Sequence, residues 1–250
     1  MNVSLFQAAA ALNANSRWQE SIAQNLAAST VPGFKKQELS FSAIQAGLMS
    51  PNSAKVSGVS SHFLLPKANV TTNFLPGEMK RTDLNTDVAI QGPGFFEIRL
   101  PNGTTGYTRD GEFQPNAQGL LTTKQGHFVL GDTGPIQLDP NSSEVLTVSP
   151  TGEVSQGAEL KGKIKLVDFN DLQLLTPIGG GIFLATNSNL QAVQVASPSL
   201  RRGFLEGANT SAVAEMVNLI SAMRMYETNQ KVIQMQDDRM GRTISELGNS

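Results

Sequence analysis

The residue types that most often carry enzymatic or metal chemistry are few in this chain of 250 residues. It has no cysteine, which excludes disulfides and thiolate metal sites, and it has only two histidines, His62 and His127. Neither histidine has a carboxylate neighbour or a metal-ligand spacing in the sequence, so we expect both to be structural or solvated. No Gly-x-Ser-x-Gly run occurs, so a serine hydrolase would lack its nucleophile elbow.

Two further patterns resemble ligand-binding loops but lack essential parts. Gly92-Pro93-Gly94 supplies two glycines of a dinucleotide fingerprint, but Glu97 occupies the third position and a strand is expected where a helix is required. Asp168, Asn170 and Asp171 resemble the start of a calcium loop, yet the glycine and the later glutamate of such a loop are missing. We therefore predict that the chain is not an enzyme and needs no cofactor or metal.

Composition limits the partners of the chain. A hydrophobic content of 39% allows a substantial core, and a formal net charge of −2 gives no electrostatic reason to expect nucleic acid or an anionic membrane. No apolar run is long enough to insert into a membrane. The first 28 residues are too polar for a signal peptide, so export would have to use a route without a cleaved signal.

The elements that organise the chain are helices expected at its two ends. A seven-residue period near the C-terminus collects apolar residues in one register, and a second register three places earlier is interrupted by two polar residues, as in a coiled-coil seam. The first register contains Leu219, Tyr226, Ile233, Met240 and Leu247, and the second contains Met216, Met223, Gln230, Asp237 and Ile244. A helix from Ser211 to Leu247 would be about 55 Å long. The alternative is a long helix that docks only on its own domain.

The N-terminal segment has a similar pattern. One register contains Leu5, Leu12, Gln19 and Leu26, and the other contains Met1, Ala8, Asn15 and Ile22. The helix is expected to stop near Ala28, because Pro32 and Gly33 follow closely and disfavour its continuation.

Between these helices the sequence pattern changes to one that is typical of loops and strands. Residues 42–86 are rich in Ser, Asn, Gly and Pro and are expected to form an irregular connector. From Asp87 onward, short apolar runs alternate with turn signals, and Asn102-Gly103 and Asp110-Gly111 favour type I′ hairpins. We therefore predict an α+β fold with segments 1–41 (assembly helix and box), 42–86 (connector), 87–204 (central antiparallel β-rich domain) and 205–250 (assembly helix).

Three blocks of sequence resemble the flagellar axial family, which comprises rod, hook and hook-associated proteins. Residues 24–35 (QNLAASTVPGFK) are similar to its N-terminal box, although Gln24 and Ala28 replace residues that are often asparagine. Residues 87–96 and 106–113 are similar to the central segment of rod and hook members. Residues 205–209 (LEGAN), 215–218 and 224–227 are similar to the C-terminal box.

This resemblance implies a structural subunit of the flagellar basal-body rod in the periplasm. Such subunits are exported by the flagellar type III export apparatus and polymerise with themselves and with other rod and hook subunits. The terminal helices would then pair as a coiled-coil-like assembly domain. The residues expected in the assembly interface are Leu5, Leu12, Ile22, Asn25, Leu26, Gly33, Phe34, Met216, Leu219, Met223, Tyr226, Ile233, Met240, Ile244 and Leu247.

The short connector and residues 131–136 favour the proximal-rod member over the distal-rod member, and the chain has no room for the extra outer domains of hook subunits. A distal-rod or hook-type subunit stays open as an alternative. A third alternative is a β-module on a helical stalk that binds the cell wall.

Overall fold

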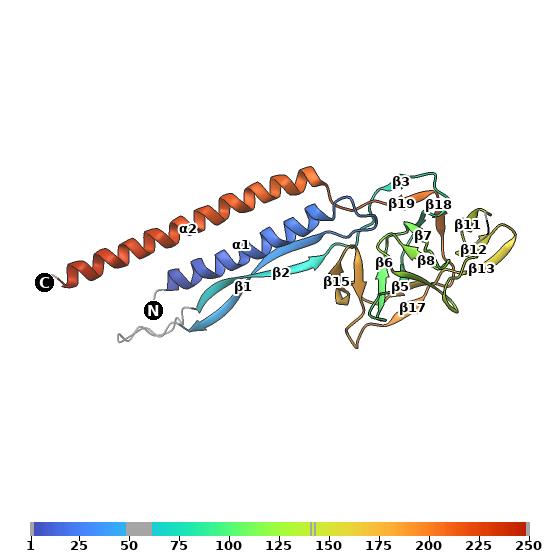
Figure 1. Cartoon of the computed structure of the whole chain (residues 1–250). Helices are drawn as coiled ribbons and strands as arrows, with labels where there is room; N and C mark the ends of the chain where they lie inside the picture. The colour runs from blue at the N-terminus through green and yellow to red at the C-terminus, as the bar shows by residue number, and fades with distance from the viewer. Residues whose placement is uncertain (1–2, 49–61, 141, 143, 249–250) are drawn as a thin grey trace. The chain divides into compact units, whose positions relative to one another are not determined.

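The computed structural model describes residues 3–48, 62–140, 142 and 144–248 (Figure 1). It divides into two compact units. Unit 1 contains the N-terminal helix, a two-stranded sheet and the C-terminal helix, within residues 1–26, 37–71 and 212–250. Unit 2 contains residues 27–36 and 72–211. Because unit 1 collects both ends of the chain, each unit is assembled from segments that are far apart in the sequence.

The two long helices of unit 1 follow the sequence prediction closely. Helix α1 is Val3–Ala27 and helix α2 is Ala212–Gly248. Helix α1 ends at Ala27. The turn that follows contains the sequence Ser-Thr-Val-Pro-Gly at residues 29–33, and Gly33 has a φ of +68°. Neither of these described helices is apolar enough over a sufficient length to cross a membrane.

The segment expected to be an irregular connector instead contains two long strands. Strand β1 is Gln37–Leu48 and strand β2 is His62–Thr72, and they pair in a sheet of unit 1. Side-chain bonds from Thr71 to the carbonyl of Glu38 and from Ser42 to the carbonyl of Lys67 place the strands antiparallel. The alternation of polar and apolar residues in these strands is weak, which explains why the sequence pattern did not reveal their length or their pairing.

Unit 2 is built around a ten-stranded antiparallel sheet. Its main path is β15-β16-β6-β5-β9-β8-β7, with β10 added to β9, and β14 pairing with both β5 and β17. The bounds are β5 Phe95–Arg99, β6 Thr105–Thr108, β7 Phe113–Pro115, β8 Leu121–Thr123, β9 Phe128–Gly131, β10 Gly134–Pro135, β14 Leu166–Phe169, β15 Thr176–Gly179, β16 Ile182–Leu184 and β17 Ala192–Gln194. A 3-10 helix, η1, covers Leu172–Leu174.

Three smaller sheets complete unit 2. Strands β11 (Leu146–Val148), β12 (Glu153–Gln156) and β13 (Glu159–Lys163) form one of them. Strand β18 (Leu200–Arg202) pairs with β4 (Val88–Ile90), and strand β19 (Phe204–Glu206) pairs with β3 (Met79–Arg81). The antiparallel β-rich centre of the predicted α+β fold is therefore confirmed, whereas a coiled-coil pairing of the terminal helices is not shown.

The core of unit 2 lies on both faces of strand β5. Phe96 packs in a cluster with Val88, Phe113 and Leu121, while its neighbour Phe95 packs in another cluster with Tyr107 and Phe183. Successive side chains of a strand point to opposite faces, so β5 is covered on both sides.

The two strongest hairpin signals have different roles in the fold. Asn102-Gly103 does join paired strands β5 and β6, but only Gly103 has a positive φ, so the turn is not type I′. Asp110-Gly111 joins strands that are not paired with each other, and Gly111 has no positive φ. Glycine is required there because a Cβ would collide with the carbonyl oxygen of Val88.

Candidate functional site

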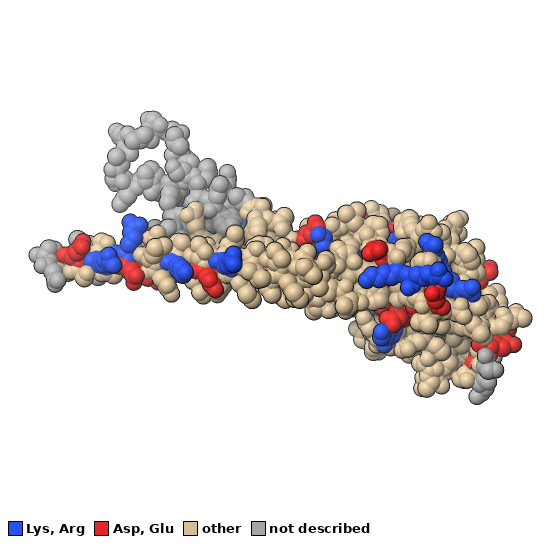
Figure 2. Space-filling view, turned by 90° about the horizontal axis from the view of Figure 1, so that it is seen from above, with Lys and Arg blue, Asp and Glu red and all other residues tan. Residues whose placement is uncertain are grey.

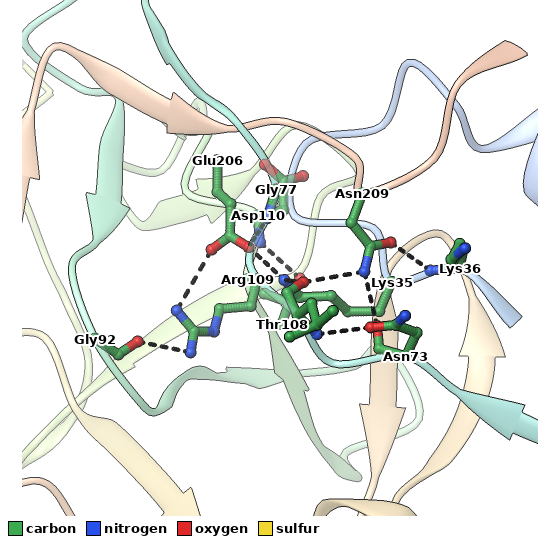
Figure 3. Close-up of polar contacts among 11 residues, drawn as sticks. Lys35, Lys36, Asn73, Gly77, Gly92, Thr108, Arg109, Asp110, Glu206 and Asn209 are labelled. Carbon is green, nitrogen blue, oxygen red and sulfur yellow. Dashed lines mark hydrogen bonds and ion pairs between the residues drawn. The ribbon is translucent and has the colours of Figure 1, made fainter.

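A buried carboxylate stands where three distant segments of unit 2 meet. Glu206 accepts hydrogen bonds from the Lys35 ammonium and from the backbone N–H of Gly77, the latter at 3.0 Å (Figure 3). Its second oxygen lies 3.4 Å from Nη1 of Arg109. The side chains of Lys35 and Glu206 are each only 1% exposed, so this ion pair is fully desolvated. We call Lys35, Arg109 and Glu206 the buried anchor.

Both cations of the buried anchor have further acceptors. Lys35 donates to the carbonyl of Leu75 at 2.9 Å, and Arg109 donates to the carbonyl of Gly92 at 2.8 Å. Burial lowers the pKa of Lys35, against the hydrogen bond and negative charge of Glu206, which raise it. Burial likewise lowers the pKa of Arg109, with Glu206 opposing the shift. The negative charge of Glu206 therefore opposes the loss of charge that burial favours at both cations.

Asn209 joins the same segments through its side-chain amide. The amide oxygen accepts the backbone N–H of Lys36 at 2.7 Å, and the amide nitrogen donates to the carbonyls of Asn73 and Leu75 (Figure 3). The side chain of Asn209 thus holds residues 36 and 73–75 together, and α2 begins at Ala212.

Gly33 and Phe34, which the sequence placed in the assembly interface, lie within unit 2. The N–H of Gly33 donates to the carbonyl of Glu206 at 2.6 Å, and the carbonyl of Phe34 accepts the N–H of Asn209 at 3.2 Å. A Cβ at Gly33 would collide with the backbone of Arg109. Both residues are buried within one chain, and their role in assembly stays a prediction.

Asn25 has an equivalent role in unit 1. Its amide nitrogen donates to the carbonyl of Gln37 and its amide oxygen accepts the N–H of the same residue, each at 2.8 Å. The side chain of Ser21 reaches the same carbonyl at 3.3 Å. Asn25 is 3% exposed, so these bonds attach the start of β1 to α1 in a site from which water is excluded.

The burial of α2 repeats every seven residues. Two sets of side chains are at least partly covered, Ala212, Leu219, Tyr226 and Ile233 in one and Glu215, Ala222, Asn229 and Gln236 in the other. All other described side chains from 213 to 243 are exposed. The first set contains Leu219, Tyr226 and Ile233, which are partly covered within one chain, and their role in assembly stays a prediction. The second set is one residue away from the expected Met216 and Met223, which are about half exposed, and Met240 is 37% exposed.

On α1 the expected apolar positions are covered to different degrees. Ile22 is 2% exposed, while Leu12 and Leu26 are partly covered. The ring of Trp18 on this helix makes an edge contact with the ring of Phe41 of β1. The side chains of Leu5, Ile244 and Leu247 lie outside the described residues, so their expected roles stay predictions.

Five apolar side chains of α2 form an exposed surface near the start of the helix, which we call the outward patch. Its members are Val213, Met216, Val217, Ile220 and Met223, each at least 50% exposed. Their spacings of three and four residues place them on one face of the helix. This face lies beside the covered one: at about 100° per residue, Ile220 is about 160° around the helix from Ala222 and about 100° from Leu219.

The groups that the sequence singled out for chemistry have structural partners. The side chain of Asp171 accepts the N–H of Gln173 at the start of η1, and Asn170 bonds to Asn189 and Gln191. Within the described part of the chain, no group of three His, Asp or Glu side chains could hold a metal ion. His62 has its side chain outside the described residues. The backbone N–H of His127 donates to the hydroxyl of Thr123 at 3.2 Å, and burial lowers the pKa of its imidazole group.

The sequence analysis missed the buried anchor and Asn209 as a functional group of residues. Lys35, Arg109, Glu206 and Asn209 do lie in the blocks that resemble the axial family. The sequence did contain one indication of this site: each of these blocks combines a charged or amide residue with apolar neighbours. Sequence spacing alone could not show that these blocks meet, because 171 residues separate Lys35 from Glu206.

We predict that replacing Glu206 by Ala lowers the unfolding free energy of unit 2 by about 3–5 kcal/mol, because it leaves Lys35 buried without its counter-ion. Lys35→Met should cost less, since Arg109 and the N–H of Gly77 still serve the carboxylate. The double change Lys35→Met/Glu206→Leu should recover much of the loss. Hydrogen exchange at amides of unit 2 measures these differences.

The matched control is Glu112→Ala, which removes an exposed ion pair with Lys124. This change should alter stability by at most about 1 kcal/mol. A Glu206→Ala loss no larger than that of the control would show that the anchor does not hold unit 2 together.

Asp110 generates a prediction about pH. Burial raises the pKa of its carboxyl group from 3.8 to about 6, and the charges of Glu112 and Asp87 add to the shift while Lys124 opposes it. The folded state therefore binds this proton more tightly than the unfolded chain, so the contribution of Asp110 to stability rises as pH falls from 7 through 6 towards 4.

Asp110→Asn keeps an oxygen that can accept the N–H of Glu112 but cannot ionise. We predict that it stabilises unit 2 at pH 7.5 by at most about 3 kcal/mol and that the advantage disappears near pH 4. Burial lowers the pKa of His127, so the contribution of His127 to stability falls as pH falls, opposite to that of Asp110. Comparing Asp110→Asn with the parent protein removes this contribution, because both proteins contain His127. Equal pH profiles of thermal unfolding for the two proteins would contradict the prediction.

Comparison with known proteins identifies the family. Residues 89–156 match the family described as the flagellar hook protein FlgE/F/G D1 domain, and residues 201–246 match the flagellar basal body rod FlgEFG protein C-terminal family. Neither is a catalytic family.

Curated relatives match over nearly the whole chain. The flagellar basal-body rod protein FlgF of Caulobacter vibrioides is 34% identical over 228 residues, covering 91% of this chain and 90% of the relative. FlgG of Borreliella burgdorferi is 33% identical over 259 residues, with 95% and 96% covered, and FlgF of Escherichia coli is 32% identical over 255 residues, with 97% of each covered. This protein therefore belongs to the flagellar basal-body rod protein family, whose members are structural subunits.

Proposed function

We propose that this chain polymerises through its terminal helices into the proximal part of the flagellar rod, which transmits torque as a drive shaft. In this proposal the chain is exported by the flagellar type III apparatus without a cleaved signal and assembles with itself and with other rod and hook subunits. The observation that carries the proposal is that α2 has exposed apolar side chains, those of the outward patch, outside the face that is covered within the chain.

The covered face of α2 contributes to unit 1. Ala222 is 0% exposed, and Leu219, Tyr226 and Ile233 lie on the same side at intervals of seven residues. The polar members of this face, Asn229 and Gln236, alternate with the apolar ones. Polar residues in such positions limit the number of registers in which two helices can pack, at some cost in stability.

The outward patch supports contact with other subunits. Its five large apolar side chains extend over roughly three turns, or about 15 Å of helix. Contiguous exposed apolar surface of this kind is unfavourable in a monomer and is typical of protein interfaces. Met216 and Met223, which the sequence assigned to the assembly interface, both belong to it. Methionine suits a surface that must pack against several neighbours in slightly different environments.

A second copy of a rod subunit is the occupant that best fits the outward patch. Unit 1 contains both terminal helices, so a single unit carries the two segments that the sequence predicts to be assembly helices. Repetition of a contact between one face of a subunit and a different face of the next produces an open helical filament. The rod is an assembly of this class.

Two positions in the rod remain to be distinguished. The chain is about equally identical to relatives named FlgF and FlgG, so these identities do not separate the two positions. The proximal assignment rests on the short connector and on residues 131–136, and a distal-rod subunit is the second candidate.

Ile220→Asp should test the role of the outward patch. It places a charge in a surface that becomes desolvated only on assembly, so we expect incorporation into basal bodies to fall by at least about tenfold. Unfolding of unit 2 should be unchanged, because the residue is 53% exposed on α2. Immunoblots of purified basal bodies and swimming assays measure the effect.

The matched control is Gln234→Asp, an exposed position of the same helix beyond the patch. It should assemble and swim normally. Normal incorporation of Ile220→Asp would show that α2 does not use this face in the polymer, and equal failure of both variants would point to general damage to the helix.

Electron micrographs of basal bodies from a strain lacking this chain should decide its position. A proximal subunit must be in place before any subunit beyond it can be added, so we expect the rod to end close to the inner membrane. A rod that retains its proximal part and lacks only its outer part would favour the distal assignment.

A further inference from the structure

Basic side chains gather in a row on one side of unit 2. Figure 2 shows this row of Lys and Arg side chains on the face seen from above, where Figure 1 has strands β3, β18 and β19. Strand β3 carries Lys80 and Arg81 and strand β18 carries Arg201 and Arg202, and all four are exposed. We call these four residues the basic strip. It is a local departure from a chain with a net charge of −2.

The basic strip is built to receive carboxylates. Arg81 already binds the carboxylate of Asp83, and both side chains are 71% exposed. Arg201 lies 3.9 Å above the ring of Phe204, which orients its guanidinium group. Leu84, next to Asp83, is 58% exposed and adds an apolar contact beside the charges.

The opposite combination of groups occurs at the turn between β12 and β13. Glu144 and Glu159 are exposed there, and the carboxylate of Glu144 lies over Gly157 in the turn. Two large apolar side chains stand beside them, Val145 at 58% and Leu160 at 61% exposure. We call these four residues the acidic tip. Lys161 pairs with Glu159 at 2.9 Å and partly balances its charge.

We propose that the acidic tip of one copy of this chain docks on the basic strip of a neighbouring copy. Carboxylates would meet guanidinium groups, while Val145 and Leu160 would cover Leu84. The strip and the tip lie on different strands of unit 2, so each copy offers both halves of the contact. Such a contact is heterologous and repeats along a filament. The inference rests on the proposed polymerisation and assigns unit 2 a part in it.

The exposed apolar residues favour a protein partner over a simple polyanion. A polyanion would gain nothing from Leu84, whereas an interface between proteins combines an apolar centre with charged groups at its rim. Complementary charge also selects the correct neighbour, because like charges placed opposite each other are strongly disfavoured.

Two charge-reversed chains provide the test. Arg81→Glu/Arg202→Glu makes the strip acidic, and Glu144→Lys/Glu159→Lys makes the tip basic. Each variant, as the only copy in the cell, places like charges opposite each other, so we expect at least about tenfold less chain in purified basal bodies. Co-expression of the two variants should restore incorporation and swimming, because the acidic strip of one then faces the basic tip of the other.

Arg99→Glu, an exposed change on β5 away from the strip, is the control and should be incorporated normally. Thermal unfolding of each purified variant shows whether unit 2 still folds. Normal assembly of either single variant, or no recovery on co-expression of folded variants, would overturn the proposal. Ile220→Asp separates this outcome from failure of the proposed function, because its defect does not depend on charge in unit 2 and co-expression with a strip variant should not rescue it.

Discussion

The buried anchor is the interaction on which unit 2 depends. The Glu206 carboxylate is withdrawn from water, and its charge is compensated by Lys35 from one end of the chain and by Arg109 from the middle. Desolvating three charged groups is expensive, so the arrangement is favourable only while all three are present with their backbone partners. This requirement fixes the paths of residues 33–36, 73–77 and 205–209 more strictly than an apolar contact would, because hydrogen bonds are directional and dispersion contacts are not.

The same constraint explains why the chain ends can form a separate unit. Asn209 and Gly33 end the segments held by unit 2, and Asn25 attaches β1 to α1 just beyond them. Asn25 and Asn209 bond to backbone groups, whereas the Glu206 carboxylate also binds the side chains of Lys35 and Arg109. The backbone groups of these irregular segments would otherwise be buried without partners.

Helix α2 is the element through which the proposed assembly would depend on the fold. A monomer needs only one apolar face on such a helix, yet Val213, Ile220 and their neighbours make a second one. The resulting surface is unfavourable in free solution and becomes favourable when another subunit covers it. In unit 2, the basic strip and the acidic tip would add charge complementarity, which selects the neighbour and its register more than it increases affinity. In this arrangement the outward patch would provide affinity between subunits, and the basic strip and the acidic tip would provide specificity.

The sequence by itself determined the two terminal helices, most strands from 88 to 194, and the family, because these depend on local periodicity, turn residues and short motifs. It did not reveal the length or the pairing of strands β1 and β2, whose pattern is too weakly alternating to be interpreted without a partner strand. It also placed the second register of α2 on Met216 and Met223, since apolar residues normally mark the covered face. Only the tertiary structure showed that Glu215 and Ala222 are covered and that the methionines point outward. Likewise, Lys35 and Glu206 become an anchor only when residues 27–36 and 72–211 fold together as unit 2, because electrostatic contact depends on distance in space and not on separation along the chain.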